Sequence, residues 1–250
     1  MNEKAPSGRL YERVAQDLSA RILRGEFAVG KRLPSERDLA QTYAVSRPTV
    51  REALIALELD GLIEVRVGSG VYVTANQPVG GTAGATDVGP FELLEARRAF
   101  ESEVCALAAA RITPEQIIAL ELLVDEMRRE NERDVVMSED ADRRFHVQIA
   151  AATCNSVMVD TVEALWAARA RSPQTKLLTL KAQQAGIIPR EDEHSAIVDA
   201  LRRRDPEAAR RAMHTHLSRA VDSLLAATEV HEVEQARARV AAERQRYAAL

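Results

Sequence analysis

The chain contains little cysteine, and none of its apolar stretches is long. Only Cys105 and Cys154 occur among 250 residues, which is typical of a reduced, cytoplasmic protein in which both thiols are small core residues. No apolar run is long enough to span a bilayer, and the first residues do not resemble a signal peptide. The sequence therefore excludes a membrane-spanning protein and favours a cytoplasmic one.

Positive charge and aromatic side chains are also scarce. The formal net charge is −4, and residues 1–75 hold 11 Lys and Arg against 10 Asp and Glu, which argues against a wholly basic nucleic-acid binder. Aromatic residues make up 4% of the chain, whereas Ala, Leu, Arg and Glu abound and favour helices. With 46% apolar residues, the chain can form one large domain or two ordinary ones.

The first part of the chain has the pattern of three short helices followed by a β-hairpin. A first helix carries one apolar stripe at four-residue spacing, and a short second helix begins at Pro34 and buries Leu39. The stripe consists of Leu10, Val14, Leu18 and Ile22. The first and third helices are predicted at 10–23 and 47–59, and the strands of the hairpin at 62–65 and 70–73.

The start of the third helix has the chemistry of a DNA-recognition helix. Ser46 is predicted to be its N-cap, and Pro48 fits its first turn, where a missing N–H does no harm. Such a turn enters the major groove and meets phosphates and base edges. Arg37, Arg47 and Arg51 can cluster there, because a guanidinium matches guanine or phosphate oxygens in two contacts. Alternatively, Arg37 and Arg51 are solvated helix charges with acidic neighbours.

Residues 10–73 resemble the GntR family of bacterial winged helix-turn-helix regulators. The motifs that carry the resemblance are Leu33-Pro34-Ser35-Glu36-Arg37, the run from Val45 to Leu54, Leu57, Asp60-Gly61-Leu62-Ile63 and Gly68-Ser69-Gly70-Val71-Tyr72-Val73. The resemblance implies that arginines contact DNA, that hydroxyls lie against phosphates and that a wing glycine approaches the minor groove. The expected DNA-binding residues are Arg37, Ser46, Arg47, Pro48, Thr49, Arg51 and Gly68. Pro48 lacks an N–H and can contribute only by its shape.

A change of composition after the hairpin predicts a second domain. Residues 74–90 are rich in Gly, Thr and Ala without periodicity, which is typical of a linker. Helical patterns then follow at 91–111, 114–131, 138–152, 156–171, 174–184, 190–203 and 206–227. The chain is thus predicted to be mainly α, with a winged helix-turn-helix domain at 1–75, a linker at 76–90, an all-α helical bundle at 91–228 and a charged helical tail at 229–250.

Four residues of the helical part can form a metal site. Asp142 and His146 stand four residues apart on one helix, so their side chains share a face. His194 and His216 lie on two other predicted helices, and inward residues of a bundle can converge. Three imidazoles and a carboxylate suit Zn²⁺, Ni²⁺ or Mn²⁺ and can leave positions open for a ligand carboxylate. Alternatively, the histidines are hydrogen-bonded core residues and Asp142 forms a simple ion pair with His146.

Residues 91–227 resemble the all-helical FCD effector domain of the FadR-type GntR branch. The matching residues are Glu95-Ala96-Arg97, Glu101, Asp142, Phe145-His146, Asn155, His194, Ile197, Ala200, Asp205, Ala208-Ala209, Met213 and His216-Leu217. The resemblance implies metal ligands at Asp142, His146, His194 and His216, with Zn²⁺ as the first choice. It also implies that Arg97 faces the effector, where its planar guanidinium suits a carboxylate. Alternatively, Arg97 forms a salt bridge with Glu101 one turn along the helix.

The nature of the effector rests on a further resemblance. The runs 89–97, 150–156 and 166–173 are similar to those of the hexuronate-utilisation (UxuR/ExuR-like) repressors of this branch. The resemblance implies a hexuronate or related sugar acid as the effector and adds Arg169 as a polar contact. The expected ligand-binding residues are Arg97, Asn155 and Arg169.

These observations lead to a hypothesis of function. We expect a homodimeric, metal-containing repressor of sugar-acid catabolism genes that binds a palindromic operator in double-stranded DNA, since two-fold protein symmetry is matched by an inverted repeat. One alternative is a GntR regulator that responds to lactate, a dicarboxylate or another sugar acid. Another is a bundle that serves only to dimerise. A metalloenzyme is disfavoured, because no motif places a general base or nucleophile near the four ligands.

Overall fold

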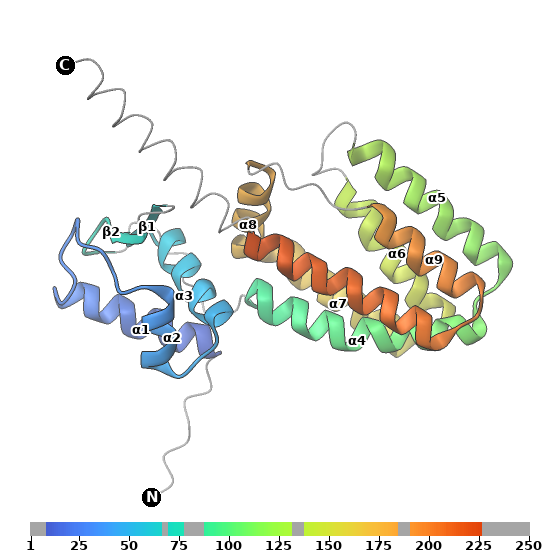
Figure 1. Cartoon of the computed structure of the whole chain (residues 1–250), viewed down its shortest axis with the longest axis horizontal. Coiled ribbons are helices and arrows are strands. Elements are labelled where there is room, and N and C mark those ends of the chain that lie inside the picture. The colour runs from blue at the N-terminus through green and yellow to red at the C-terminus, as the bar shows by residue number, and fades with distance from the viewer. Residues whose placement is uncertain (1–8, 67–69, 78–87, 132–137, 185–190, 227–250) are drawn as a thin grey trace, which may run out of the picture. The chain divides into compact units, whose positions relative to one another are not determined.

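The structure is a computed structural model, and it describes residues 9–66, 70–77, 88–131, 138–184 and 191–226 (Figure 1). Within these residues the chain divides into two compact units, of which the first ends at Phe91 and the second runs from Glu92 to Ala226. Most of the predicted linker at 76–90 and the whole predicted tail at 229–250 lie outside the described residues, so those boundaries stay predictions.

The first unit consists of three helices and a two-stranded antiparallel sheet. The elements are α1 (Leu10–Leu23), α2 (Glu36–Tyr43), α3 (Arg47–Leu59), β1 (Ile63–Arg66) and β2 (Gly70–Val73). Helix α3 packs against both α1 and α2, and its predicted inward residues Val50, Leu54 and Leu57 are buried. The strands pair with Ile63 opposite Val73, so the unit has the predicted helix-turn-helix and hairpin.

Two details of this unit differ from the sequence prediction. Leu10 is exposed, and Tyr11 is buried in its place at the start of the stripe on α1. An α-helix turns about 400° in four residues, so a stripe at strict four-residue spacing drifts about 40° per step, whereas a three-residue step from Tyr11 to Val14 corrects the drift. Helix α2 begins at Glu36 rather than at Pro34, because the Ser35 side chain caps it by accepting from the Asp38 N–H at 3.2 Å.

The turn between α2 and α3 is held by local geometry. Ala44 ends α2 in the left-handed conformation, with φ of 51°, which reverses the chain within a few residues. Ser46 then caps α3 by accepting from the Thr49 N–H at 3.2 Å, and Pro48 lies in the first turn of that helix. The predicted N-cap and first-turn proline are both found, and together they fix where the recognition helix starts.

The second unit is a bundle of helices. It contains α4 (Pro90–Arg111), α5 (Pro114–Asn131), α6 (Ser138–Ala152), α7 (Ser156–Arg171), α8 (Pro173–Gln184), α9 (Glu191–Arg202) and a helix over residues 206–226. Helix α5 packs against α6 and α9, and α6 packs against α7. The bonds from Arg98 to Ser218 and from Arg210 to Glu103 show that the helix over 206–226 runs antiparallel to α4. Where a helix limit lies inside the described residues, it falls within a residue of the predicted one.

The core of the bundle is continuous and apolar, and it surrounds a polar centre. Phe145, Ile149, Leu120, Ile197 and Leu201 are fully buried in it. Burial of such side chains contributes about 1.5–3 kcal/mol each, which is the source of stability for a chain with so few aromatic residues. No helix of the described part of the chain is long and apolar enough to cross a membrane.

One expectation about the cysteines is wrong. Cys105 is fully buried in the bundle core, as predicted, but Cys154 is exposed. Cys154 lies in the turn between α6 and α7 with φ of 52°. Its neighbours supply the polar groups of that turn, since Thr153 bonds back to Ala150 and Asn155 caps α7. The pattern of the sequence places residue 154 between two helices, and a turn residue has no core to enter.

Candidate DNA surface and metal centre

The first turn of α3 displays the predicted recognition residues together. Ser46 and Arg47 are exposed, and Pro48 and Thr49 are half-buried beside them. The Ser46 and Thr49 hydroxyl oxygens lie 2.8 Å apart, so the capping bond also fixes the orientation of two hydroxyls. Arg37 is exposed on α2. The predicted wing residue Gly68 lies outside the described residues.

Arg51 differs from the other arginines of this surface. It is only 6% exposed, and its Nε lies 2.9 Å from Glu36 Oε2. Arg47 reaches the same carboxylate at 3.6 Å but remains exposed. Helix α2 packs against α3 and brings Glu36 over Arg51, so for Arg51 the structure shows the alternative of an acidic neighbour. A contact of Arg51 with DNA stays a prediction.

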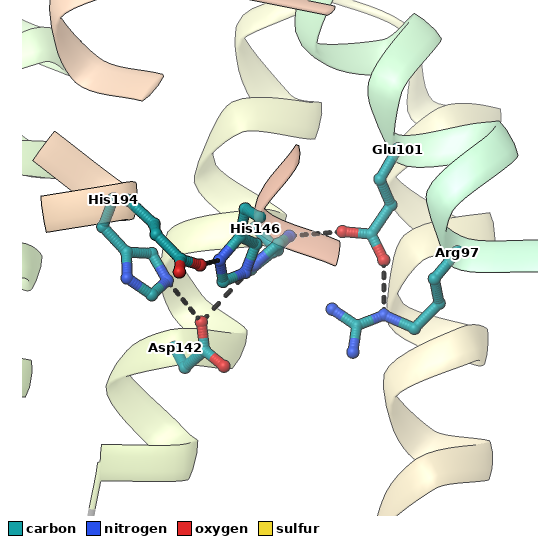
Figure 2. Close-up of polar contacts among 7 residues, drawn as sticks. Arg97, Glu101, Asp142, His146 and His194 are labelled. Carbon is teal, nitrogen blue, oxygen red and sulfur yellow. Dashed lines mark hydrogen bonds and ion pairs between the residues drawn. The ribbon is translucent and has the colours of Figure 1, made fainter. Parts of the chain in front are cut away.

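Four side chains from three helices of the second unit converge on one point. Asp142 and His146 come from α6, His194 comes from α9 and His216 comes from the helix over 206–226. Each offers one ligand atom, and these atoms all lie within 4.8 Å of one another. Asp142 Oδ1 lies 3.0 Å from His194 Nε2 and 3.4 Å from His146 Nε2 (Figure 2). The structure therefore brings together all four residues that the sequence singled out.

Contacts between aromatic rings hold the three histidine side chains in place around this point. Phe145 meets the ring of His194 edge-on at 5.1 Å and that of His146 at 5.8 Å, and the His194 and His216 ring centroids are 4.4 Å apart. The imidazole of His146 is buried, yet its Nε2 has no hydrogen-bond partner among the described residues. This atom lies 3.4 Å from Asp142 Oδ1, and a buried polar atom that makes no hydrogen bond costs about 1–3 kcal/mol, so the pair fits two ligands of one metal better than a core hydrogen bond.

The charges of two members of the cluster suit a cation, whereas at His146 the carboxylates of Glu101 and Asp142 outweigh burial and raise the pKa of the ring. The histidines beside Asp142 outweigh its burial and hold the pKa of that carboxyl well below its ordinary range. Burial, together with the neighbouring His194 and His146, lowers the pKa of His216 to about 4. A charged carboxylate and a neutral imidazole are the forms that bind a metal. The set of three nitrogens and one oxygen is one that Zn²⁺ and related divalent ions accept.

Two glutamates that were not predicted as site residues lie directly behind the histidines. Glu101 Oε2 is hydrogen-bonded to His146 Nδ1, and Glu193 Oε2 lies 3.0 Å from His216 Nδ1. Glu101 was noticed only as part of the FCD resemblance and as a partner for Arg97. Nothing in the sequence distinguishes Glu193 from the other acidic residues of its segment, because its partner is 23 residues away.

Arg97 forms the predicted alternative salt bridge and also lies beside the cluster. Its Nε lies 2.6 Å from Glu101 Oε1, and the side chains of both residues are buried. Its guanidinium carbon lies 4.0 Å from the centroid of the Trp166 ring, a cation–π contact. Figure 2 shows the two outer nitrogens of Arg97 on the side facing Asp142, away from Glu101.

The other two predicted ligand-binding residues lie in different surroundings. Arg169 contacts the Trp166 ring, with 5.5 Å from its guanidinium carbon to the ring centroid, and pairs with Glu139 at 2.9 Å. Asn155 is exposed and caps α7 by accepting from the Val157 N–H at 3.0 Å. It follows the end of α6, and Ala152 lies about 15 Å along that helix from Asp142 at 1.5 Å per residue. The structure therefore does not bring Asn155 to the cluster.

A helix-turn-helix with a hairpin, followed in the chain by a helical bundle, is the architecture of a transcriptional regulator. Residues 10–73 match the family described as "Bacterial regulatory proteins, gntR family", and residues 92–219 match the FCD domain. The chain belongs to the gntR family of bacterial regulatory proteins and is a DNA-binding transcriptional regulator of the group with an FCD domain. The prediction of a regulator rather than an enzyme is thereby confirmed.

Similar proteins of known name are regulators too. The chain is 40% identical over 214 residues to the Exu regulon transcriptional regulator of Escherichia coli K12, covering 84% of this chain and 82% of the relative. It is 34% identical over 242 residues to the Uxu operon transcriptional regulator of the same organism, covering 93% of each. It is 35% identical to the transcriptional repressor NanR of Cronobacter sakazakii, covering 84% of this chain and 83% of the relative. The predicted resemblance to regulators of the UxuR/ExuR type is confirmed.

Proposed function

We propose that this protein represses genes of sugar-acid catabolism and that a hexuronate bound at a metal centre changes its affinity for DNA. In this account Asp142, His146, His194 and His216 hold a divalent transition metal, with Zn²⁺ as the first choice. The observation that carries the proposal is the convergence of three histidines and a carboxylate, in which buried His146 Nε2 makes no hydrogen bond and lies 3.4 Å from Asp142 Oδ1.

A four-coordinate Zn²⁺ held by three of these residues would keep one position for an oxygen of the effector, and an ion that takes five or six ligands would keep positions beside all four. An acid carboxylate next to the metal lies on the side to which the outer nitrogens of Arg97 point (Figure 2). The Nε of Arg97 is already bonded to Glu101, so the guanidinium is oriented before any effector arrives. Arg169 contacts the same Trp166 ring as Arg97 and is the second candidate for a polar contact with the sugar acid.

The names of the relatives support the choice of effector. One is called a regulator of the Exu regulon and another a regulator of the Uxu operon, and we read these names as hexuronate regulons. As a homodimer the protein would place two recognition helices on an inverted repeat. A coupling free energy of about 1–3 kcal/mol between effector and DNA is enough for a useful switch.

A thermal-shift screen of purified protein tests the proposal. The protein is stripped with EDTA, reloaded with Zn²⁺, Ni²⁺ or Mn²⁺, and heated with D-galacturonate, D-glucuronate, lactate or a dicarboxylate. We expect one hexuronate to raise Tm of the metal-loaded protein and to have no effect on the stripped protein. If metal is bound but only a different acid raises Tm, the hexuronate is the wrong effector.

A matched pair of histidine variants identifies the site. His216 is one of the clustered residues, whereas His214 lies two residues away on the same helix and is exposed. His216→Ala should abolish the metal-dependent shift, and His214→Ala should keep it. Equal shifts in both variants would refute the metal site.

A further inference from the structure

Two of the clustered histidines are each hydrogen-bonded to a glutamate, and each of these glutamates in turn contacts an arginine. The His146 ring is hydrogen-bonded through Nδ1 to Glu101, which in turn bonds Arg97. The His216 ring is bonded through Nδ1 to Glu193, whose other oxygen lies 3.1 Å from Arg219 Nη1. The two series use the same three residue types in the same order, and each comes from two separate segments of the chain.

We propose that Glu101 and Glu193 are positioning residues for the metal and that Glu101 also positions Arg97 for the effector acid. The inference rests on the proposed metal centre and assigns to it two groups that do not touch the metal. Both carboxylates face a ring nitrogen, and an ionised carboxylate can only accept a hydrogen bond. Nδ1 of each ring must therefore carry the proton, which leaves the lone pair of Nε2 for the metal.

This arrangement fixes both the tautomer and the rotation of the ring before a metal binds. The geometry at His146 agrees with this, because Nδ1 is engaged by Glu101 while Nε2 makes no hydrogen bond and lies 3.4 Å from Asp142 Oδ1. Partners of this kind behind a metal-binding histidine typically change metal affinity by about 10–100-fold when they are removed.

The two glutamates differ in the burial of the arginine that each one holds. Glu101 and Arg97 are both buried, whereas the side chain of Arg219 is 47% exposed. A hydrogen bond between charged groups is stronger away from water, so Glu101 should matter more than Glu193 for the metal. Glu101 is also the partner of the Arg97 Nε. Loss of its charge therefore frees both His146 and Arg97.

The experiment compares Glu101→Gln, Glu193→Gln and a control in full-length protein. Glu103→Gln is the control, because Glu103 lies on the same helix as Glu101 but is exposed and pairs with Arg210. Zn²⁺ affinity is measured by competition with a chromophoric chelator, without any acid. We expect Glu101→Gln to weaken Zn²⁺ binding about 10–100-fold, Glu193→Gln to weaken it less, and the control to match the unaltered protein.

Two further readouts separate positioning from a general loss of structure. Co²⁺ replaces Zn²⁺ as a coloured probe, and its visible absorption should change in Glu101→Gln and be largely restored in Glu101→Asp, which keeps a carboxylate. With saturating Zn²⁺, titration with D-galacturonate should show a larger loss of affinity in Glu101→Gln than in Glu193→Gln. Circular dichroism checks that each variant is folded.

The outcomes distinguish this inference from the proposed function. If the unaltered protein binds no Zn²⁺ and no Co²⁺, both are overturned. A second outcome is that the unaltered protein binds Zn²⁺ with the same affinity as folded Glu101→Gln and folded Glu193→Gln. In that case the metal centre stands and the positioning roles are wrong. If Glu101→Gln is unfolded, Glu101→Asp and Glu193→Gln decide: unchanged Zn²⁺ affinity and Co²⁺ absorption in both would overturn the inference.

Discussion

The two units place the side chains to which we assign a function in opposite surroundings. In the first unit, Arg37, Ser46 and Arg47 are exposed, and the last two lie in the first turn of one helix. In the second unit, His146, Glu101 and Arg97 are buried and come from two helices. A DNA-binding surface must be accessible to a large partner, whereas a site for a metal and a small acid gains strength from the exclusion of water.

This difference has a consequence for mutations. Exposed Arg47 makes only a partly solvated ion pair with Glu36, so its loss is expected to affect DNA binding more than stability. A buried ligand of the cluster is part of a network, so its loss removes the partner of other buried groups as well.

The largest effect is expected for the removal of a buried ligand. His146→Ala should abolish the stabilisation that metal gives the protein, which amounts to about 4 kcal/mol when the metal is present at 1,000 times its Kd. Thermal unfolding with and without Zn²⁺ measures the difference. A metal-dependent shift that survives in His146→Ala would place the metal elsewhere.

A smaller effect, confined to DNA, is expected in the first unit. Arg47→Ala should weaken binding to a specific duplex by about 1–3 kcal/mol, because one arginine contact is lost. Metal-dependent stabilisation should stay as it is. Fluorescence anisotropy with labelled duplex measures the affinity, and Arg143→Ala on the exposed surface of α6 is the matched control. Equal affinity of Arg47→Ala and the control would exclude Arg47 from the DNA surface.

The caps of the recognition helix should contribute about 1 kcal/mol. Ser46→Ala removes the acceptor of the Thr49 N–H, and loss of an N-cap costs about 0.5–2 kcal/mol. Chemical denaturation should show this loss, and Ser46→Asp, which can cap as well, should recover it. If Ser46→Ala is as stable as the unaltered protein, the cap does not fix the helix start.

The smallest effect is expected for an exposed ion pair of the second unit. A hydrogen bond from Arg210 lowers the pKa of Glu103, so the pair stabilises the fold above the ordinary pKa of a glutamate and loses this effect as pH falls. Because both side chains are largely in water, Glu103→Gln should change Tm at pH 7 by little more than the error of the measurement. A large decrease in Tm would show that the exposure of this ion pair does not predict its contribution to stability.

The same contrast explains how much the sequence could predict. The helices, the hairpin and the first turn of α3 follow from local patterns such as Ser46 with Pro48, and nearly all were found within a residue. The cluster of Asp142, His146, His194 and His216 could be predicted because helical spacing and a family resemblance agreed. The burial of Arg51 in the first unit could not be predicted from the sequence, because Glu36 reaches Arg51 only when α2 packs against α3.

Contacts between distant segments account for the other differences. Glu193 meets His216 across two helices, and no spacing rule connects them. Asn155 was grouped with the effector residues because it lies in a matching segment, yet its side chain is used by the helix start beside it. Cys154 was expected in the core from the general preference of cysteine, and the turn it occupies decides otherwise.

The central claim is that a metal-held acid in one unit controls DNA binding by the other. The most direct measurement is the affinity for a duplex that the protein itself has selected from a random library, taken with and without D-galacturonate or D-glucuronate. The account predicts that a hexuronate changes the affinity of metal-loaded protein by about 5–150-fold and leaves EDTA-stripped protein and His194→Ala unchanged. An equal response of all three, or no response of the metal-loaded protein to either acid, would contradict it.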